Sequence, residues 1–163
     1  TVSAVRDIVW LLRPGGDHRI ATVEHLRETS SIMLETLDWK FTANEDAWNV
    51  ELPEEETRHL FLFFREALHN IKRHAKAKKV EIRVEKNDGK FRLVIHDDGV
   101  GIPAEKLERP STLRALRQRT EALGANLKVE STAEQGTRLE LTVPLDRKRP
   151  RKKRLPVVPA GDS

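Results

Sequence analysis

The sequence predicts an α/β (α+β) sandwich, in which helices cover one face of a mostly antiparallel sheet. Two kinds of pattern indicate this class. Apolar residues recur at helical spacing over residues 53–75, whereas residues 80–95 and 127–143 alternate apolar and polar side chains, as strands with one buried face do. With 163 residues, the chain is long enough for one ordinary domain, or for one domain with a short appendage.

The N-terminal part alternates helical and extended patterns. Residues 1–13 carry apolar residues at helical spacing up to a Pro-Gly-Gly stop, and we expect them to be the end of a longer helix. Asp17 can cap a second helix, whose apolar positions, Ile32 among them, recur with a period near 3.6. Residues 39–41 and 48–50 then alternate, which predicts two short strands or edge segments.

The strongest helical pattern begins at Pro53. Three glutamates occupy its first turn, where the helix dipole favours negative charge, and the helix should end near Ala75. Residues 80–84 and 91–95 then alternate strictly around an Asp-Gly turn, which predicts a β-hairpin. A Gly-rich segment follows at residues 97–101.

The C-terminal half adds one helix and two strands. Residues 112–123 predict a helix that ends at Gly124, a residue type that favours helix C-termini. Residues 127–129 and 139–143 predict strands, joined by a turn that ends at Gly136. No internal repeat interrupts this order.

The basic character of the chain is confined to its C-terminal end. The formal net charge is +4, but residues 145–163 hold seven basic and two acidic residues, which leaves −1 on residues 1–144. The mixture of proline and basic residues predicts a disordered tail over 146–163. Such a tail can contact nucleic acid or an anionic membrane loosely, although a solvated charged terminus is the commoner case. We therefore do not expect nucleic acid as the partner of the folded body.

Several functional classes are excluded by composition. The absence of cysteine excludes disulfides, thiolate zinc sites and a cysteine nucleophile. No apolar run approaches the roughly 20 residues that span a bilayer, and the N-terminus has no signal-peptide pattern, so we expect a cytoplasmic protein. Because the sequence opens on Thr rather than Met, we expect a fragment. With three Trp, five Phe and no Tyr, the chain has few of the rings that single-stranded nucleic-acid binders use.

Two strands are predicted to point a polar side chain into the core. Asp97 shares the parity of the apolar residues at 91–95, and Thr137 shares the parity of those at 139–143. A buried carboxylate is costly unless it accepts hydrogen bonds. The pattern therefore predicts either a structural network or a polar ligand in an apolar pocket.

A second pair of polar residues lies on the long helix. Glu66 and Asn70, spaced i and i+4, share one helix face with His74. Taken alone, this pair is more simply an exposed Glu beside a surface Asn. Gly99 and Gly101 allow a tight turn and a close backbone approach directly after the hairpin. Combined with the inward polar residues, these features favour a ligand site.

Four segments carry a resemblance to a known family. They are REALHNIKRHA at 65–75, DDGVGI at 97–102, LRALRQRTEALG at 113–124 and Gly136-Thr137. They resemble the N, G1, lid-helix and G2 elements of the ATP-binding domain of sensor histidine kinases, and the third is similar to the nitrate-sensor-like branch. The segment VRDIVWLLRP at 5–14 resembles the end of the second dimerisation helix. The resemblance implies the Bergerat fold of gyrase-type topoisomerases, a mixed, mostly antiparallel sheet with helices on one face.

The resemblance implies a division into the end of a dimerisation helix at 1–14, an ATP-binding domain at 17–145 and the tail. It also implies a site for ATP and Mg²⁺. Asn70 would coordinate the Mg²⁺ through a neutral oxygen. Asp97 would accept a hydrogen bond from the adenine amino group. The other residues implied at the nucleotide are Thr137 in support of the carboxylate, Arg73, His74 and Lys76 near the phosphates, and Gly99, Gly101, Ile102, Ser111, Thr112, Leu113 and Gly136 in the loop, lid and G2 segments.

The catalytic base and the acceptor are less directly implied. Glu66 matches the water-activating base of the hydrolytic superfamily members, although in kinases the proton acceptor more often lies beside the phosphorylated histidine. None of the six histidines precedes an acidic residue on a predicted helix, so the acceptor histidine is expected upstream of this chain. Members of this branch carry Gly-x-Gly-Leu before the lid helix, where residues 110–113 are Pro-Ser-Thr-Leu. The hydroxyls of Ser111 or Thr112 would then hold phosphate, or the lid would not hold it.

The sequence thus predicts the catalytic, ATP-binding part of a sensor histidine kinase. The intact protein would transfer the γ-phosphoryl group of ATP to a histidine, for relay to a response regulator. It would form a homodimer through its dimerisation helices, and a membrane anchor elsewhere in the full-length protein is compatible with this prediction. The alternative is a nucleotide-binding regulatory (pseudokinase) module without phosphoryl transfer, which the missing lid glycines favour.

Overall fold

The computed structural model describes residues 18–145, with side chains from residue 22 onward. In chain order the elements are α2 (His18–Met33), β1 (Asp38–Ala43), the 3₁₀ helix η1 (Glu45–Asn49), α3 (Glu54–Asn70), the π-helical turn η2 (Ile71–Ala75), β2 (Lys79–Asn87), β3 (Lys90–Asp97), α4 (Ala104–Leu107), α5 (Arg114–Ala122), β4 (Asn126–Thr132) and β5 (Gly136–Pro144). The helix predicted within 1–14 and the tail predicted at 146–163 lie outside the described residues.

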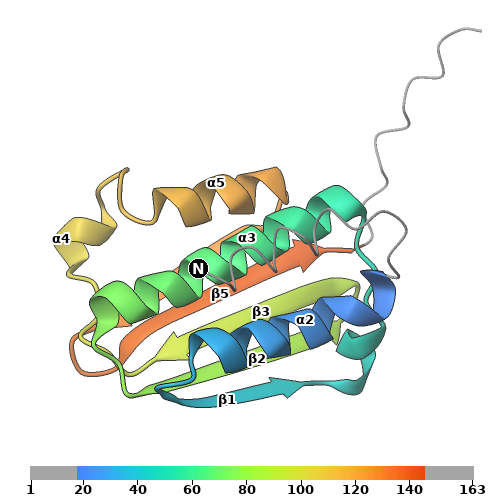
Figure 1. Cartoon of the computed structure of the whole chain (residues 1–163). Coiled ribbons are helices and arrows are strands. Elements are labelled where there is room, and N and C mark those ends of the chain that lie inside the picture. Colours follow the sequence, from blue (N-terminus) through green and yellow to red (C-terminus); the bar gives the residue numbers. More distant parts are fainter. Residues whose placement is uncertain (1–17, 146–163) are drawn as a thin grey trace, which may run out of the picture.

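The five strands form one mixed sheet with the order β1-β2-β3-β5-β4. Only the β1–β2 pair is parallel, and the other three pairs are antiparallel. Helices α2, α3 and α5 lie on the same side of the sheet (Figure 1). The predicted sandwich is confirmed, with its mixed, mostly antiparallel sheet and its helices on one face.

The core lies between α3 and the inward face of the central strands. Phe63 and Phe64 of α3 and Phe91 of β3 are buried, as are the other inward residues of β3 and β5. Burial of one such side chain stabilises the fold by about 1.5–3 kcal/mol. The predicted hairpin is confirmed, since Asp88 and Gly89 take φ values of 51° and 69° in the turn between β2 and β3. Alternation along β3 and β5 thereby fixes which residues face the helices.

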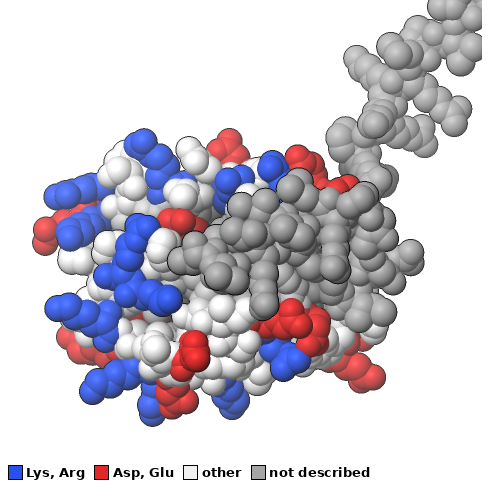
Figure 2. All heavy atoms as spheres, viewed as in Figure 1, with Lys and Arg blue, Asp and Glu red and all other residues white. Residues whose placement is uncertain are grey.

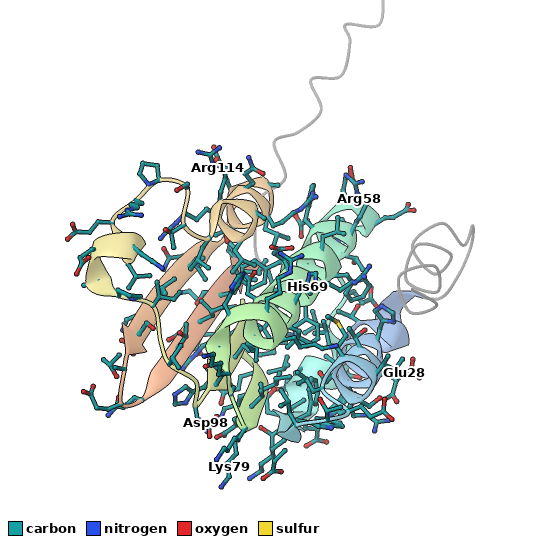
Figure 3. All side chains as sticks on the ribbon, turned by 60° about the vertical axis from the view of Figure 1, so that its left-hand side comes forward. Glu28, Arg58, His69, Lys79, Asp98 and Arg114 are labelled. Atoms are coloured by element: carbon teal, nitrogen blue, oxygen red, sulfur yellow. The ribbon has the colours of Figure 1, made fainter. Side chains whose placement is uncertain are left out.

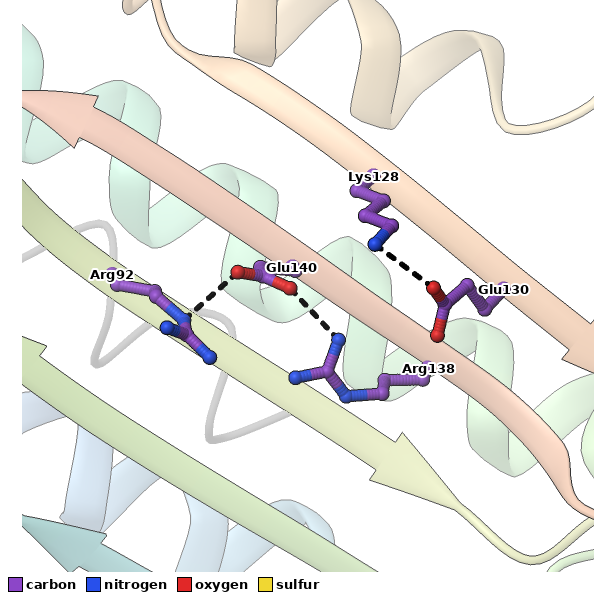
Figure 4. A network of polar contacts seen from close by, with 5 residues as sticks. All are labelled: Arg92, Lys128, Glu130, Arg138 and Glu140. Carbon is purple, nitrogen blue, oxygen red and sulfur yellow. Dashed lines mark hydrogen bonds and ion pairs between the residues drawn. The ribbon is translucent and has the colours of Figure 1, made fainter.

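The opposite face of the sheet carries charged side chains in place of a second helical layer. Glu140 lies between Arg92 and Arg138, with oxygen-to-nitrogen distances of 2.9 and 2.8 Å, and Lys128 pairs with Glu130 on β4 (Figure 4). The hydrogen bond from Arg138, assisted by the charge of Arg92, lowers the pKa of Glu140. The Lys128–Glu130 pair is exposed, and such pairs contribute little stability, typically below about 1 kcal/mol, whereas Glu140 is half-buried between its two arginines.

The strand predicted at 48–50 is wrong. Residues Glu45–Asn49 form η1, which Asn44 caps by accepting a hydrogen bond from the backbone N–H of Ala47 at 3.1 Å. The same Asn44 oxygen accepts from the N–H of Lys86 at 3.0 Å, which ties the turn to β2. The buried residues of this turn, Ala47 and Val50, are three residues apart, as in a helix. The apolar Trp48, two residues before Val50, gave the sequence the appearance of strand alternation.

Two helix predictions also need correction. Ile32 was predicted on the apolar face of α2 but is 46% exposed, because the buried face of this helix runs through Leu26 and Ser30. The Ser30 hydroxyl is buried there because it donates a hydrogen bond to the Leu26 carbonyl oxygen at 2.8 Å. The lid helix begins at Arg114 rather than at 112, after a short helix α4 that the sequence did not predict. Its predicted end is confirmed, with Gly124 at φ 55°. Among residues 18–145, no helix is both long and apolar enough to cross a membrane.

Candidate functional site

A cavity of about 750 Å³ opens between α3, the segment from 100 to 116 and the ends of β3 and β5. Ten of the fourteen residues predicted for the site line it: Glu66, Asn70, His74, Asp97, Gly101, Ile102, Ser111, Thr112, Leu113 and Thr137. Arg73, Lys76, Gly99 and Gly136 do not line it. We call the side formed by the ends of β3 and β5, with the neighbouring end of β4 behind them, the strand-end wall, and the side formed by residues 102–116 the lid wall.

Asp97 and Thr137 face each other across the β3–β5 ladder in the strand-end wall. Both are buried, with 4% and 9% of their surface exposed, as their parity predicted. The backbone N–H of Gly99 donates to Asp97 Oδ1 at 2.9 Å. Burial raises the pKa of the Asp97 carboxyl, and the backbone N–H groups of Gly99 and Thr137 oppose part of that rise. A carboxylate with free acceptor capacity therefore stands in a largely apolar cavity.

The glycines of the site are required by close backbone approaches. A side chain at Gly99 would place its Cβ 2.1 Å from the carbonyl oxygen of Ala75, and one at Gly136 would place it 2.0 Å from that of Asp97. Gly136 also has φ 75°. Neither glycine lines the cavity. They let the loop after β3 pass between the end of the long helix and the β4–β5 turn.

Gly101 performs the same role one step later along the loop. Its φ is 74°, and a Cβ there would lie 2.4 Å from the carbonyl oxygen of Thr132. The N–H of the next residue, Ile102, donates to Ser131 Oγ at 2.6 Å. Sequence analysis missed Ser131, although it continues the inward parity of Leu127 and Val129 along β4 and could have been found by the argument used for Thr137.

Asp98, the second aspartate of the DDGVG segment, has a structural role. Its Oδ1 accepts from the N–H groups of Lys78 and Lys79 at 2.8 and 2.9 Å. These backbone hydrogen bonds lower the pKa of Asp98. Figure 3 shows Asp98 and Lys79 next to each other, at the end of the sheet below the long helix. The two adjacent aspartates thus have different roles: Asp97 faces the cavity, and Asp98 holds the loop to β2.

The long helix presents Glu66, Asn70 and His74 to the cavity, one turn apart. Its last turn, Ile71–Ala75, is π-helical, a local widening often found at functional sites. Arg73 is directed elsewhere, with Nη2 3.4 Å from Nδ1 of the exposed His69. Lys76 ends the turn in the left-handed region and is exposed. Of the three basic residues predicted near phosphate, the structure brings only His74 to the cavity.

The lid wall contains residues that sequence analysis did not assign. Lys106 of α4 and Arg114 at the start of α5 line the cavity together with Ser111 and Thr112. Figure 3 shows Arg114 at the first turn of the lid helix. The expected glycines fall at Pro110 and Thr112, and the leucine after them, Leu113, takes the left-handed conformation at φ 57°, which costs a non-glycine residue roughly 1–2 kcal/mol.

Contact with α3 fixes the far end of the lid helix. Arg119 Nη1 lies 3.1 Å from Nδ1 of His59 on α3. Burial and the neighbouring Arg119 lower the pKa of His59.

Over the visible surface, Lys and Arg side chains are interspersed with Asp and Glu and do not form a continuous basic face (Figure 2). The charges relevant to an anion are therefore those local to the cavity.

The residues at the cavity fit a magnesium–polyphosphate ligand better than a metal held by protein alone. Within residues 18–145 there is no group of three or more His, Asp or Glu side chains placed to hold a metal. Glu66 and Asn70 offer oxygen donors one helical turn apart. Mg²⁺ commonly takes one or two protein oxygens, with substrate phosphates and water completing its shell.

Comparison with known proteins agrees with this arrangement. Residues 55–147 match the family described as histidine kinase-, DNA gyrase B- and HSP90-like ATPases. The signal transduction histidine-protein kinase/phosphatase UhpB of Salmonella typhimurium is 31% identical over 148 residues, which are 86% of this chain and 28% of UhpB. The sensor protein VraS of Staphylococcus aureus is 36% identical over 90 residues, 55% of this chain and 26% of VraS. The chain spans about a quarter of the length of these relatives.

The fold has close counterparts among solved structures. The histidine kinase domain of the Erythrobacter litoralis EL346 blue-light-activated kinase has a TM-score of 0.65 at 26% identity, over 76% of this chain and 61% of that one. Acinetobacter baumannii AdeS, at 20% identity and a TM-score of 0.63 over 78% of this chain and 64% of its own, shares the fold. Since the family match covers more than half of the sequence, the chain belongs to the histidine kinase-, DNA gyrase B- and HSP90-like ATPases, with an ATP-binding domain of the histidine kinase type.

Proposed function

We propose that the domain binds Mg²⁺·ATP in the cavity and supplies the γ-phosphoryl group to a histidine on a segment outside this chain. The observation that carries the proposal is the buried pair Asp97 and Thr137, which line an otherwise apolar wall of a cavity large enough for a nucleotide. In an apolar cavity a carboxylate is costly unless a ligand donates to it. The names of the relatives, a kinase/phosphatase and a sensor protein, support the same activity.

The strand-end wall would bind the base. Asp97 would accept a hydrogen bond from the exocyclic amino group of adenine through the acceptor capacity that Gly99 leaves free. Ile95 and Leu139, which line the cavity on the same strands, would pack against the ring. Adenine is favoured over a ligand without a donor, because part of the acceptor capacity of this buried carboxylate would otherwise stay unfilled beside the hydrogen bond from Gly99.

The opposite end of the cavity would hold the phosphates. Asn70 would contribute an oxygen to Mg²⁺, and the bound ion would supply positive charge that neutralises the phosphates. Lys106 and Arg114 would contact the phosphates from the lid, together with the hydroxyls of Ser111 and Thr112. This set replaces the backbone N–H groups of the missing lid glycines. Phosphoryl transfer depends mostly on positioning and charge stabilisation, so a side-chain clamp of this kind is sufficient in principle.

Glu66 lies one turn before Asn70 on the same cavity face and is the candidate for orienting the attacking group. A general base must lie within hydrogen-bond reach of the proton that it accepts. The role of Glu66 therefore depends on where the acceptor histidine docks. A response regulator would then receive the phosphoryl group. The homodimer, the dimerisation helix and any membrane attachment of the full-length protein are part of the same proposal and concern segments outside residues 18–145.

A two-part experiment tests this function. Binding of a non-hydrolysable Mg²⁺·ATP analogue to the chain is measured by calorimetry, and radiolabelled ATP is then offered together with a separately supplied dimerisation segment of the full-length protein. Saturable binding with transfer to a histidine of that segment is expected, and Glu66→Gln should slow transfer more than it weakens binding. Binding without transfer would favour the regulatory alternative, and no saturable binding would contradict the proposal.

A further inference from the structure

The lid helix α5 borders the cavity at one end and is held to α3 at the other. Arg114, Ala115 and Leu116, at its start, line the cavity. Arg119, in its last turn, does not line the cavity and reaches His59 of α3, which runs beside it (Figure 1). A helix rises about 1.5 Å per residue, so the two arginines lie roughly 7.5 Å apart along one short rod. What holds Arg119 therefore also affects where Arg114 stands.

The chemistry of the two side chains fixes the direction of the hydrogen bond between Arg119 and His59. A guanidinium group carries N–H donors and no acceptor. Because Arg119 Nη1 lies 3.1 Å from Nδ1 of His59, the imidazole nitrogen must accept. It can accept only when the ring is neutral and holds its single proton on Nε2. A proton on Nδ1 would set two N–H donors against each other.

The charges around His59 favour the neutral ring. His59 and Arg119 are both half-buried. Burial lowers the pKa of His59 most, and the positive charges of Arg119 on α5 and of Arg58 on its own helix lower it further. Among the described residues, Glu55 is the acid that opposes this effect, and it is itself paired with Arg58 at 3.5 Å. A proton on His59 therefore meets two cations and little compensating negative charge.

We propose that His59 is a positioning residue of the lid: as a neutral imidazole it holds the last turn of α5 through Arg119, and its protonation in mild acid releases that contact. Arg114, at the first turn, then loses its fixed place at the cavity, and contact with phosphate weakens. His59 does not line the cavity, so it acts through the lid helix alone. The effect on phosphate rests on the proposed ATP-binding function, whereas the contact with the lid does not.

The first test needs no nucleotide. Long-range ¹⁵N–¹H NMR spectra show which ring nitrogen carries the proton, and His59→Gln identifies the signals of His59 by their loss. The Nε2–H tautomer is expected at about pH 7.5. Hydrogen exchange of the α5 amides is then followed as pH falls to about 5. Protection should drop about threefold or more further in the parent chain than in His59→Gln, whose amide oxygen can accept from Arg119 but cannot titrate.

The second test measures dissociation constants of adenosine and of a non-hydrolysable Mg²⁺·ATP analogue over the same pH range. Parent and His59→Gln should bind the analogue equally at about pH 7.5, and the parent about threefold or more weakly than the variant at about pH 5. Adenosine should bind both equally throughout. The nucleotide phosphates and Asp97 titrate in both chains, so the ratio of the two constants isolates His59.

His69→Gln is the matched control for both tests. His69 is an exposed histidine of the same helix, its Nδ1 lies 3.4 Å from Nη2 of Arg73, and it does not line the cavity. Because this second arginine–histidine pair is not on the lid, the His69→Gln variant should follow the parent chain at every pH.

The outcomes separate this inference from the proposed function. An Nδ1–H tautomer of His59 at neutral pH, or equal lid protection in parent and His59→Gln at every pH, would overturn the inference with or without a nucleotide. Absence of saturable binding of the analogue would contradict the proposed function, and lid exchange then confirms or overturns the contact by itself. If the parent loses adenosine binding in parallel with the analogue, His59 supports the cavity as a whole, and its role in positioning the phosphate contact is wrong.

Discussion

The two walls of the cavity differ in what holds their polar groups in place. In the strand-end wall, Asp97, Ser131 and Thr137 sit at paired positions of the sheet and bond one another's strands or loops. In the lid wall, Lys106 lies on the short helix α4, and Arg114 is the first residue of α5. The strand-end wall is therefore preorganised by backbone pairing, whereas the lid wall depends on long side chains. Under the proposed function, recognition of the base would be built into the fold, and recognition of the phosphates would be adjustable.

The largest effect is expected where the backbone of the strand-end wall is closest packed. Gly136→Ala would place a Cβ 2.0 Å from the Asp97 carbonyl at φ 75°, so we expect a loss of about 3 kcal/mol or more in unfolding free energy, measured by urea denaturation. Gly89→Ala, at φ 69° in the hairpin turn, is the control and should cost about 1 kcal/mol. Equal losses in the two variants would show that the close approach is not needed.

The next effect concerns the metal. Asn70→Ala should lower the affinity for ATP about tenfold or more in Mg²⁺, because the amide oxygen proposed to bind the metal is lost, and should change it little in EDTA. The comparison of titrations with and without Mg²⁺ checks this. His69→Ala changes an exposed residue of the same helix that does not line the cavity, and should leave both affinities unchanged. An Asn70→Ala loss that persists in EDTA would contradict a metal-binding role.

A smaller effect is expected at the lid wall. Lys106→Ala and Arg114→Ala should each weaken ATP about three- to tenfold and leave adenosine binding unchanged, because charge-assisted contacts to phosphate are made only by the nucleotide tail. Calorimetric titration with both ligands measures the difference. Arg109→Ala removes an exposed lid charge that does not line the cavity, and should have no effect. A parallel loss of adenosine binding would mean that these residues support the fold of the lid instead.

The two adjacent aspartates should give pH dependences of opposite sign. Folding raises the pKa of Asp97, so its contribution to stability is present at low pH and is lost as pH rises through the folded-state pKa. Folding lowers the pKa of Asp98, so its contribution is present above the unfolded-state pKa and is lost as pH falls. Unfolding free energies of Asp97→Asn and Asp98→Asn, each compared with the parent across acidic pH, should diverge in opposite directions. Parallel curves would contradict the assignment.

Sequence patterns predicted the strand-end wall better than the lid wall, for a physical reason. Period-two alternation places Asp97 and Thr137 inward whatever the tertiary context, because a strand has only two faces. The same rule would have found Ser131. The conformation at Leu113 and the short helix α4 are not marked by periodicity or by a glycine, so the positions of Lys106 and Arg114 follow only from three-dimensional packing.

The short apolar–polar alternation at residues 48–50 led to the wrong prediction of a strand. Alternation over three residues is too short to separate a strand from a helical turn, and the deciding signal was the cap at Asn44. On α3 and the turn η2 that continues it, helical spacing correctly grouped Glu66, Asn70 and His74 at the cavity. Spacing did not predict that Arg73 turns away toward His69. Pattern identifies a face, whereas neighbouring elements decide which part of that face is covered.

The most direct measurement compares ATP with purine riboside triphosphate, which lacks the 6-amino group, in the parent chain and in Asp97→Asn. If the buried carboxylate accepts from adenine, the parent should bind ATP at least about tenfold more tightly than the analogue, since a hydrogen bond to a charged group contributes about 1.5–3 kcal/mol. Asp97→Asn should bind both with similar, weaker affinity. Equal affinity of the parent for the two nucleotides would contradict the account of the strand-end wall.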